Sequence, residues 1–196
     1  IVRDHYRELL RRNYIWMPAM VMFRRDPLER IGGFNSDVNA AADYVVYLHL
    51  ARHYPVYDHA QVVAHYRRHD RNMSGNAGRM LRETLEVMRS QLPFLAGDEA
   101  SSAAYQEGWR TWQEFYGAHL ATEIRVAVRN SRWLEAMSKA TILGLYHPRG
   151  LWHHARRKGE LTLQDLAGHK ALPAPHDALP SAARQKAQGT VPPSST

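Results

Sequence analysis

Apolar positions recur with two different spacings along this chain, one typical of helices and one typical of strands. Helical spacing runs through residues 3–12 and through the segment that starts at Asp43. Segments rich in β-branched and aromatic residues, which favour strands, lie at 20–24, 54–57 and 61–66. The first 95 residues therefore predict a mixed α/β arrangement.

Beyond about residue 74 the spacing of apolar residues is helical only. One helix ends at Pro93, with Ser74 or Asn76 as its cap, and we expect it to pack against the sheet. Its apolar stripe consists of Leu81, Leu85, Met88 and Leu92. A linker over 93–102 separates this helix from the rest of the chain.

After the linker, a long helix carries a stripe that is heavy in aromatic residues. The stripe consists of Tyr105, Trp109, Trp112, Tyr116, Leu120 and Ile124. Packing between helices is the simplest interpretation, and an amphipathic element at a membrane surface is the alternative. A further helix, capped by Ser131, carries Leu134, Met137, Thr141 and Leu145 at helical spacing.

These changes of pattern predict three parts of the chain. Residues 1–95 form an α/β unit, and residues 96–170 form an all-helical appendage. Pro, Ala, Gln and Ser dominate residues 171–196, which predicts a disordered tail. The sequence opens with Ile1 just before a predicted helix, so we expect an N-terminal portion to be missing.

Composition narrows the classes of site and partner. The chain of 196 residues has a formal net charge of +7 and no cysteine, which excludes disulfides and thiolate metal sites. No apolar run reaches the length of about eighteen residues that predicts a transmembrane helix. The positive charge favours polyanions such as nucleic acid, anionic lipid headgroups or a diphosphate. Arginine pairs are scattered along the chain. A single pair indicates solvated surface, whereas all the pairs together could contact an anionic membrane.

Asp43 is the carboxylate of greatest chemical interest because it lies at or just inside the start of a predicted helix. The free N–H groups and positive dipole end of a helix favour the ionised form of such a carboxylate. An ionised carboxylate is an available base near neutral pH. The alternative is that Asp43 only caps the helix.

Two polar or aromatic groupings accompany Asp43. Gly32 and Gly33 permit backbone angles closed to other residues, so they turn Phe34 and Asn35 toward a neighbouring surface. The second grouping follows the predicted strand 61–66 and consists of His69, Asn72 and Ser74. Ligands bind at the ends of strands in open α/β sheets, which makes this second grouping a candidate site.

Roughly the first ninety residues resemble the second half of the catalytic domain of family 2 inverting glycosyltransferases, which have the GT-A fold. The resemblance is carried by the ordered succession NYIWMPAMVMFRRDPLERIGGFN, AADYVVYLHLARHYPV and VVAHYRRHDRNMS. It implies a partial GT-A, Rossmann-like mixed sheet. It also implies that Asp43 is the general base and that His69 lies near the donor diphosphate, where in some members it ligates the metal.

The resemblance implies further site residues. The acceptor would lie against Trp16, Gly33, Phe34 and Asn35, and the donor diphosphate against Arg68, Arg71 and Ser74. A divalent cation, Mg²⁺ or Mn²⁺, would be held mostly by an Asp-x-Asp motif that this chain lacks. Many relatives have Glu-Asp where this chain has Ala42-Asp43, and an acidic residue where it has Val45, so this site carries fewer carboxylates.

The function expected from the resemblance is inverting transfer of a sugar from a nucleotide-sugar donor to a saccharide or lipid-linked acceptor. Cell-envelope polysaccharide or glycolipid synthesis is the expected setting, in the cytoplasm with peripheral contact at the inner face of the plasma membrane. No specific nucleic acid is expected, and we expect the isolated chain to be inert. The alternative is a non-catalytic basic helical module that binds a membrane surface or nucleic acid.

Overall fold

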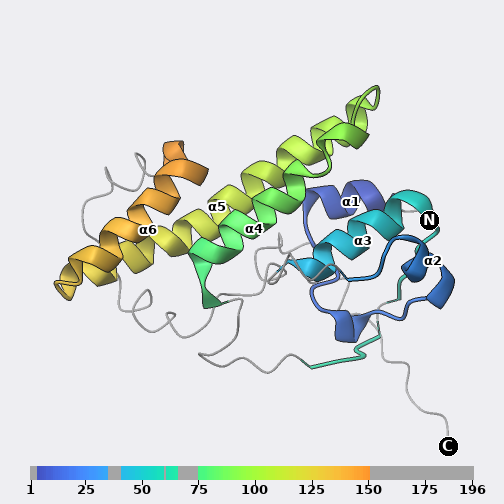
Figure 1. Ribbon diagram of the computed structural model, residues 1–196, viewed down its shortest axis with the longest axis horizontal. Coiled ribbons are helices and arrows are strands. Elements are labelled where there is room, and N and C mark those ends of the chain that lie inside the picture. The colour runs from blue at the N-terminus through green and yellow to red at the C-terminus, as the bar shows by residue number, and fades with distance from the viewer. Residues whose placement is uncertain (1–3, 35–40, 60, 66–74, 151–196) are drawn as a thin grey trace, which may run out of the picture.

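The computed structural model describes residues 4–34, 41–59, 61–65 and 75–150, and their regular structure is helical (Figure 1). The α-helices are α1 (His5–Arg11), α2 (Arg25–Arg30), α3 (Ala42–His53), α4 (Ala77–Arg89), α5 (Glu99–Arg129) and α6 (Trp133–Tyr146). Two short 3-10 helices, η1 (Pro18–Met20) and η3 (Leu92–Phe94), connect them.

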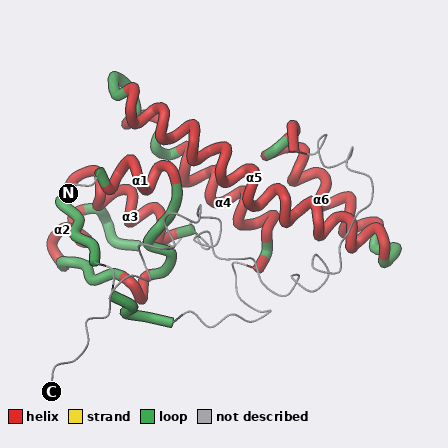
Figure 2. Tube along the Cα trace, turned by 180° about the vertical axis from the view of Figure 1, so that it is seen from behind, coloured by secondary structure: helices red, strands yellow, loops and turns green. Residues whose placement is uncertain are grey.

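The predicted mixed α/β sheet, and with it the partial GT-A fold, is wrong for the part of the chain that the structure describes. Figure 2 shows helices and loops in these ranges and no strand. Val21 and Arg24 do have extended backbone angles, but the segment 21–24 has no regular structure. The described residues of the other two predicted strands, 54–57 and 61–65, also lie in irregular backbone.

The physical reason is that a strand exists only with a partner. Extended residues become a strand when a neighbour takes up their N–H and C=O groups, and strand propensity mainly reflects packing against such neighbours. Here Met22 is 98% exposed and Val62 78% exposed, so these apolar side chains find no packing surface. Helix α4, which was expected to pack against a sheet, packs against α5 and α6 instead.

The core lies between a long helical pair and the shorter helices that cross it. In Figure 1, α4 and α5 run side by side, α6 folds back along the second half of α5, and α1 and α3 pack together beside the pair. One cluster of buried side chains joins these helices, and it includes Leu10, Tyr44, Leu48, Leu81, Leu85, Met88, Trp112, Tyr116, Leu120 and Leu143. The predicted boundary at residues 95–96 therefore falls inside a shared core.

Helix α1 crosses α5 at close range because α5 has a glycine at the crossing. A Cβ atom on Gly108 would lie 1.8 Å from the carbonyl oxygen of Leu10. Two ion pairs flank the contact, Arg7 with Asp98 at 3.2 Å and Arg11 with Glu107 at 3.0 Å. The crossing fixes the first helix of the chain to the longest one.

Several helix ends differ from the predicted ones. Asn76 caps α4 by accepting a hydrogen bond from the Arg79 N–H, as one of the two alternatives had it. Helix α2 has Arg24 at its N-cap and Asp26 in its first turn. Helix α6 begins at Trp133 with Arg132, not Ser131, at its N-cap. Capping depends on backbone angles one or two residues from the helix end, which spacing alone does not determine.

The aromatic stripe of α5 is confirmed as packing between helices. Trp112, Tyr116 and Leu120 are buried, and Tyr105, Trp109 and Ile124 pack against the core at its edge. Among the described residues, no helix is both long enough and apolar enough to cross a lipid bilayer. Residues 171–196, the predicted disordered tail, lie outside the described ranges.

Candidate functional site

Asp43 lies in the first turn of α3, as predicted. The N-cap residue is Ala41, which offers no side-chain acceptor, and the helix begins at Ala42. The Asp43 carboxylate takes over that role from inside the helix, because its Oδ1 accepts the backbone N–H of Tyr44 at 2.8 Å. Capping, the alternative interpretation of this residue, is therefore part of what Asp43 does.

The environment of Asp43 acts on its charge in a direction that the sequence did not indicate. Burial raises the pKa of Asp43 to about 6, against the opposing effect of the backbone N–H groups that it accepts. No cation forms an ion pair with it within the described ranges. Desolvation therefore outweighs the helix terminus. At pH 7 the carboxylate is still roughly nine-tenths ionised.

Two tyrosines lie close enough to Asp43 for its negative charge to affect their pKa values. Burial raises the pKa of Tyr47, one turn further along α3, and the Asp43 carboxylate raises it further. Burial likewise raises the pKa of Tyr116 on α5, and Asp43 contributes to that shift too. The Tyr47 hydroxyl is buried and has no hydrogen-bond partner among the described residues. The sequence indicated Tyr47 and Tyr116 only as members of apolar stripes.

A row of aromatic rings leads from Tyr47 to the surface. Phe23 stacks on Tyr47 with the ring centroids 6.2 Å apart, and Phe34 meets Phe23 edge-on at 6.0 Å. Phe34 is 47% exposed, so the row ends in solvent. Phe23 was not among the predicted site residues, because its side chain joins the row only through the fold.

The glycine pair places Phe34 in this row. Gly32 and Gly33 have φ angles of +84° and +68°, which lie in the region that favours glycine. The predicted turn of Phe34 toward a neighbouring surface is confirmed, and that surface is the ring of Phe23. The role of Gly33 and Phe34 at an acceptor site stays a prediction.

Trp16, the remaining predicted acceptor residue among the described ones, has an unusual backbone. Its φ is +77°, which for a bulky residue costs on the order of 1–3 kcal/mol. Its N–H donates to the Asn13 side chain at 3.1 Å, and its side chain is half-buried without joining the main core. The ring is therefore only partly buried.

The other predicted site residues lie outside the described residues. They are Asn35 on the acceptor side, Arg68, Arg71 and Ser74 on the donor side, and His69 as the metal ligand. Their convergence on Asp43 stays a prediction. Within the ranges that are described, no three His, Asp or Glu side chains gather as a metal site.

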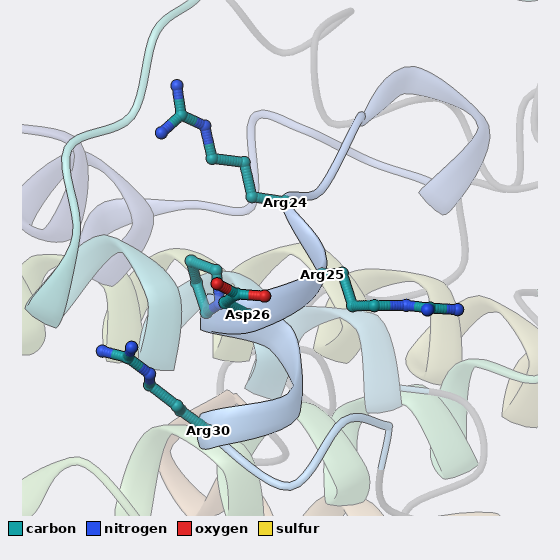
Figure 3. A pocket seen from close by; sticks show the side chains of 5 residues that line it. Arg24, Arg25, Asp26 and Arg30 are labelled. Carbon is teal, nitrogen blue, oxygen red and sulfur yellow. The ribbon is translucent and has the colours of Figure 1, made fainter.

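A shallow hollow of about 380 Å³ lies over α2 and is lined by Arg24, Arg25, Asp26, Pro27 and Arg30. Figure 3 shows its three guanidinium groups pointing in different directions. Arg25 pairs with Glu29 on the surface at 3.5 Å. Tight phosphate binding needs donors that converge on the same oxygens, so this hollow has no built anion site.

Comparisons with protein-family models, with curated protein sequences and with solved structures found no match to this chain. A function must therefore be inferred from the described residues and from the resemblance carried by their sequence. Asp43, with the aromatic row beside it, is the feature of the described molecule best suited to chemistry.

Proposed function

We propose that this chain supplies the acceptor-activating base of an inverting sugar transferase, and that Asp43 is that base. In the reaction, the acceptor hydroxyl oxygen forms a bond to the anomeric carbon of a nucleotide sugar. The bond from that carbon to the diphosphate oxygen breaks, and the nucleoside diphosphate leaves with the electron pair. The hydroxyl proton passes to the carboxylate, and the configuration at the anomeric carbon inverts.

The observation that carries the proposal is the combination of position and environment at Asp43. A base is most effective when its pKa lies near the working pH, and burial raises the pKa of Asp43 to about 6. No cation in the described ranges neutralises the carboxylate, which leaves its charge available to a proton. Perturbed carboxylates of this kind cluster at functional sites.

The aromatic row gives the acceptor a surface beside the base. The exposed ring of Phe34 begins the row and Tyr47, one turn from Asp43, ends it. Aromatic faces bind the apolar faces of sugar rings while leaving hydroxyl groups free to react. A saccharide or the sugar of a lipid-linked acceptor would suit this surface.

A divalent cation, Mg²⁺ or Mn²⁺, would neutralise the leaving diphosphate in a transferase of this type. The described residues provide no donor set for such an ion, and His69 lies outside them. No step proposed for this chain runs through the ion. The proposed setting is the cytoplasm, with peripheral contact at the membrane.

The test is to replace Asp43 by Asn in the full-length protein that carries this sequence. Asn keeps the shape and the acceptor for the Tyr44 N–H but cannot take a proton. We expect turnover with a nucleotide-sugar donor to fall about a hundredfold to ten-thousandfold, with donor affinity unchanged. Turnover would be followed by nucleoside diphosphate release, and donor affinity by calorimetry.

Asp26→Asn is the matched control, because Asp26 is also in the first turn of a helix but is exposed. That variant should retain full turnover. Near-normal turnover of Asp43→Asn would reject Asp43 as the base.

A non-catalytic module for nucleic acid is the weaker alternative. Such a module needs its cations on one face. The described arginine pairs lie on separate elements, at the end of α1 and the start of α2, and Arg11 is already paired with Glu8 and Glu107. We therefore favour sugar transfer over nucleic-acid binding as the function.

A further inference from the structure

Helix α6 exposes an apolar face that no other part of the described chain covers. Trp133, Leu134, Met137 and Leu145 are 59%, 86%, 66% and 71% exposed. Steps of three, four and four residues align Leu134, Met137, Thr141 and Leu145 along one side of the helix, and Trp133 lies one turn before Met137. These five residues are the outer face of α6.

The charged residues of α6 are turned away from that face. Its two charged side chains are Glu135 and Lys139. Lys139 pairs with Glu123 of α5 at 2.9 Å and with Glu135 at 2.6 Å. An ordinary surface helix buries its apolar residues and exposes its charges. Helix α6 instead holds its charges in ion pairs, one of which reaches α5, and presents apolar side chains to solvent.

The inner face of α6 is already used for packing, so the outer face is a second apolar face. Ala136 and Leu143 are buried, and Ile142 packs against the core. Figure 1 shows α6 at the end of the helical pair, away from α1, α2 and α3. The outer face is therefore accessible without disturbing the core.

Cations lie at both ends of the outer face. Arg129 and Arg132 are exposed just before α6, where Arg132 also pairs with Glu135 at 2.9 Å, and Arg149 is exposed just after the helix. A second copy of the chain would bring like charges together in either orientation of the two helices. An anionic surface would meet attraction at both ends.

We propose that the outer face of α6 docks on the surface of an anionic membrane. The helix would lie flat along about 21 Å of bilayer, with its apolar side chains among the acyl chains. Trp133 would lie at headgroup level, where tryptophan is enriched, and the flanking arginines would contact lipid phosphates. This inference does not depend on the sugar-transfer proposal.

The experiment uses the full chain and vesicles of phosphatidylcholine with or without phosphatidylglycerol, in a sedimentation assay. The test variant carries Leu134→Asp and Leu145→Asp, both at exposed positions, so the core is untouched. The control variant carries Ala103→Asp and Gln106→Asp at exposed positions on the first half of α5, which changes the net charge equally. Circular dichroism establishes that each variant keeps its helical content.

We expect wild type and control to bind the anionic vesicles, and the test variant to lose about a hundredfold in partitioning. Since the chain has no cysteine, Leu134→Cys provides a unique site for an environment-sensitive fluorophore, with Gln106→Cys as its control. The label at position 134 should shift to the blue on binding, and the label at 106 should not.

Equal vesicle binding by the test and control variants would overturn the proposal. Failure of the wild-type protein to bind the anionic vesicles would also overturn it. In that case, a dimer in analytical ultracentrifugation would indicate that the outer face of α6 binds a second copy of the chain. A monomer would indicate that the face binds residues after 150 or another protein.

Discussion

At the scale of single residues, Asp43 combines two roles that oppose each other. As a helix cap it accepts the N–H of Tyr44, which stabilises the fold. As a partly buried carboxylate without a cation among the described residues, it is held in a site that disfavours its charge. Residues that carry function often oppose stability in this way.

This opposition predicts a particular dependence of stability on pH. The pKa of Asp43 is raised from 3.8 to about 6 on folding. Between these values the folded state binds more protons than the unfolded state, so the free energy of unfolding falls as pH rises from about 4 to 6. Asp43→Asn should remove this fall and be more stable than wild type at pH 7.5 by about 2–3 kcal/mol. Urea unfolding followed by circular dichroism at pH 4, 6 and 7.5 measures the difference.

A purely capping Asp43 gives the reverse result. The variant would then be equal to wild type or weaker at pH 7.5, and the pH dependence would be the same in both proteins. That outcome would remove the physical basis for Asp43 as a tuned base.

At the scale of elements, α1 crosses α5 so closely that the backbone of α1 occupies the space where a side chain at position 108 would lie. The space at Gly108 is filled by backbone, the Leu10 carbonyl, which cannot rotate away. Gly78 at the start of α4 differs, because a Cβ there would meet the Cδ1 of Ile142 at 3.2 Å, and that atom ends a flexible side chain.

The two glycines therefore predict opposite outcomes for the same substitution. Gly108→Ala should lower the free energy of unfolding by more than about 2 kcal/mol, because the two backbones must separate. Gly78→Ala should change it by less than about 0.5 kcal/mol, since better helix propensity offsets a small shift of Ile142. Equal effects in chemical denaturation would show that α1 is not fixed against α5 as described.

The outer face of α6 also belongs to this scale. The sequence spacing found the stripe of Leu134, Met137 and Leu145. Spacing does not say which of two apolar sides a helix buries. The stripe faces outward because the opposite side of α6 carries the buried Leu143 and Lys139, which pairs with Glu123 of α5.

At the scale of the whole molecule, α5 is the element on which the others assemble. Helices α1, α4 and α6 all pack on it. Its first turn is fixed to α1 through Asp98, which caps α5 at the Ser101 N–H and binds the guanidinium of Arg7. The two predicted domains therefore share one core and should unfold in one transition.

Acid should weaken this link between α1 and α5. Hydrogen bonds from the Ser101 side chain and backbone, followed by the one from Arg7, hold the pKa of Asp98 down to about 2. The stabilisation is full above pH 4 and is lost as pH falls from about 4 toward 2. Asp98→Asn should therefore melt at a lower temperature than wild type above pH 4, and the difference should vanish near pH 2. Thermal melts from pH 2 to 6 test this, with the exposed Asp26→Asn as control.

Most of the helices and the turn at Gly32 and Gly33 could be predicted from the amino-acid sequence alone. Residue spacing, caps such as Asn76 and glycine φ angles are properties of neighbouring residues, which a sequence records directly. It also placed Asp43 at the start of a helix, and the structure agrees.

How those elements pack, and which side chains they bury, became clear only from the three-dimensional fold. The extended segments near 22 and 62 did not become strands, because no described neighbour pairs with them. The pKa of Asp43 rose rather than fell, and α6 turned its apolar stripe to solvent. Each of these outcomes depends on burial against residues far away in the chain, and burial is a property of packing that local spacing does not contain.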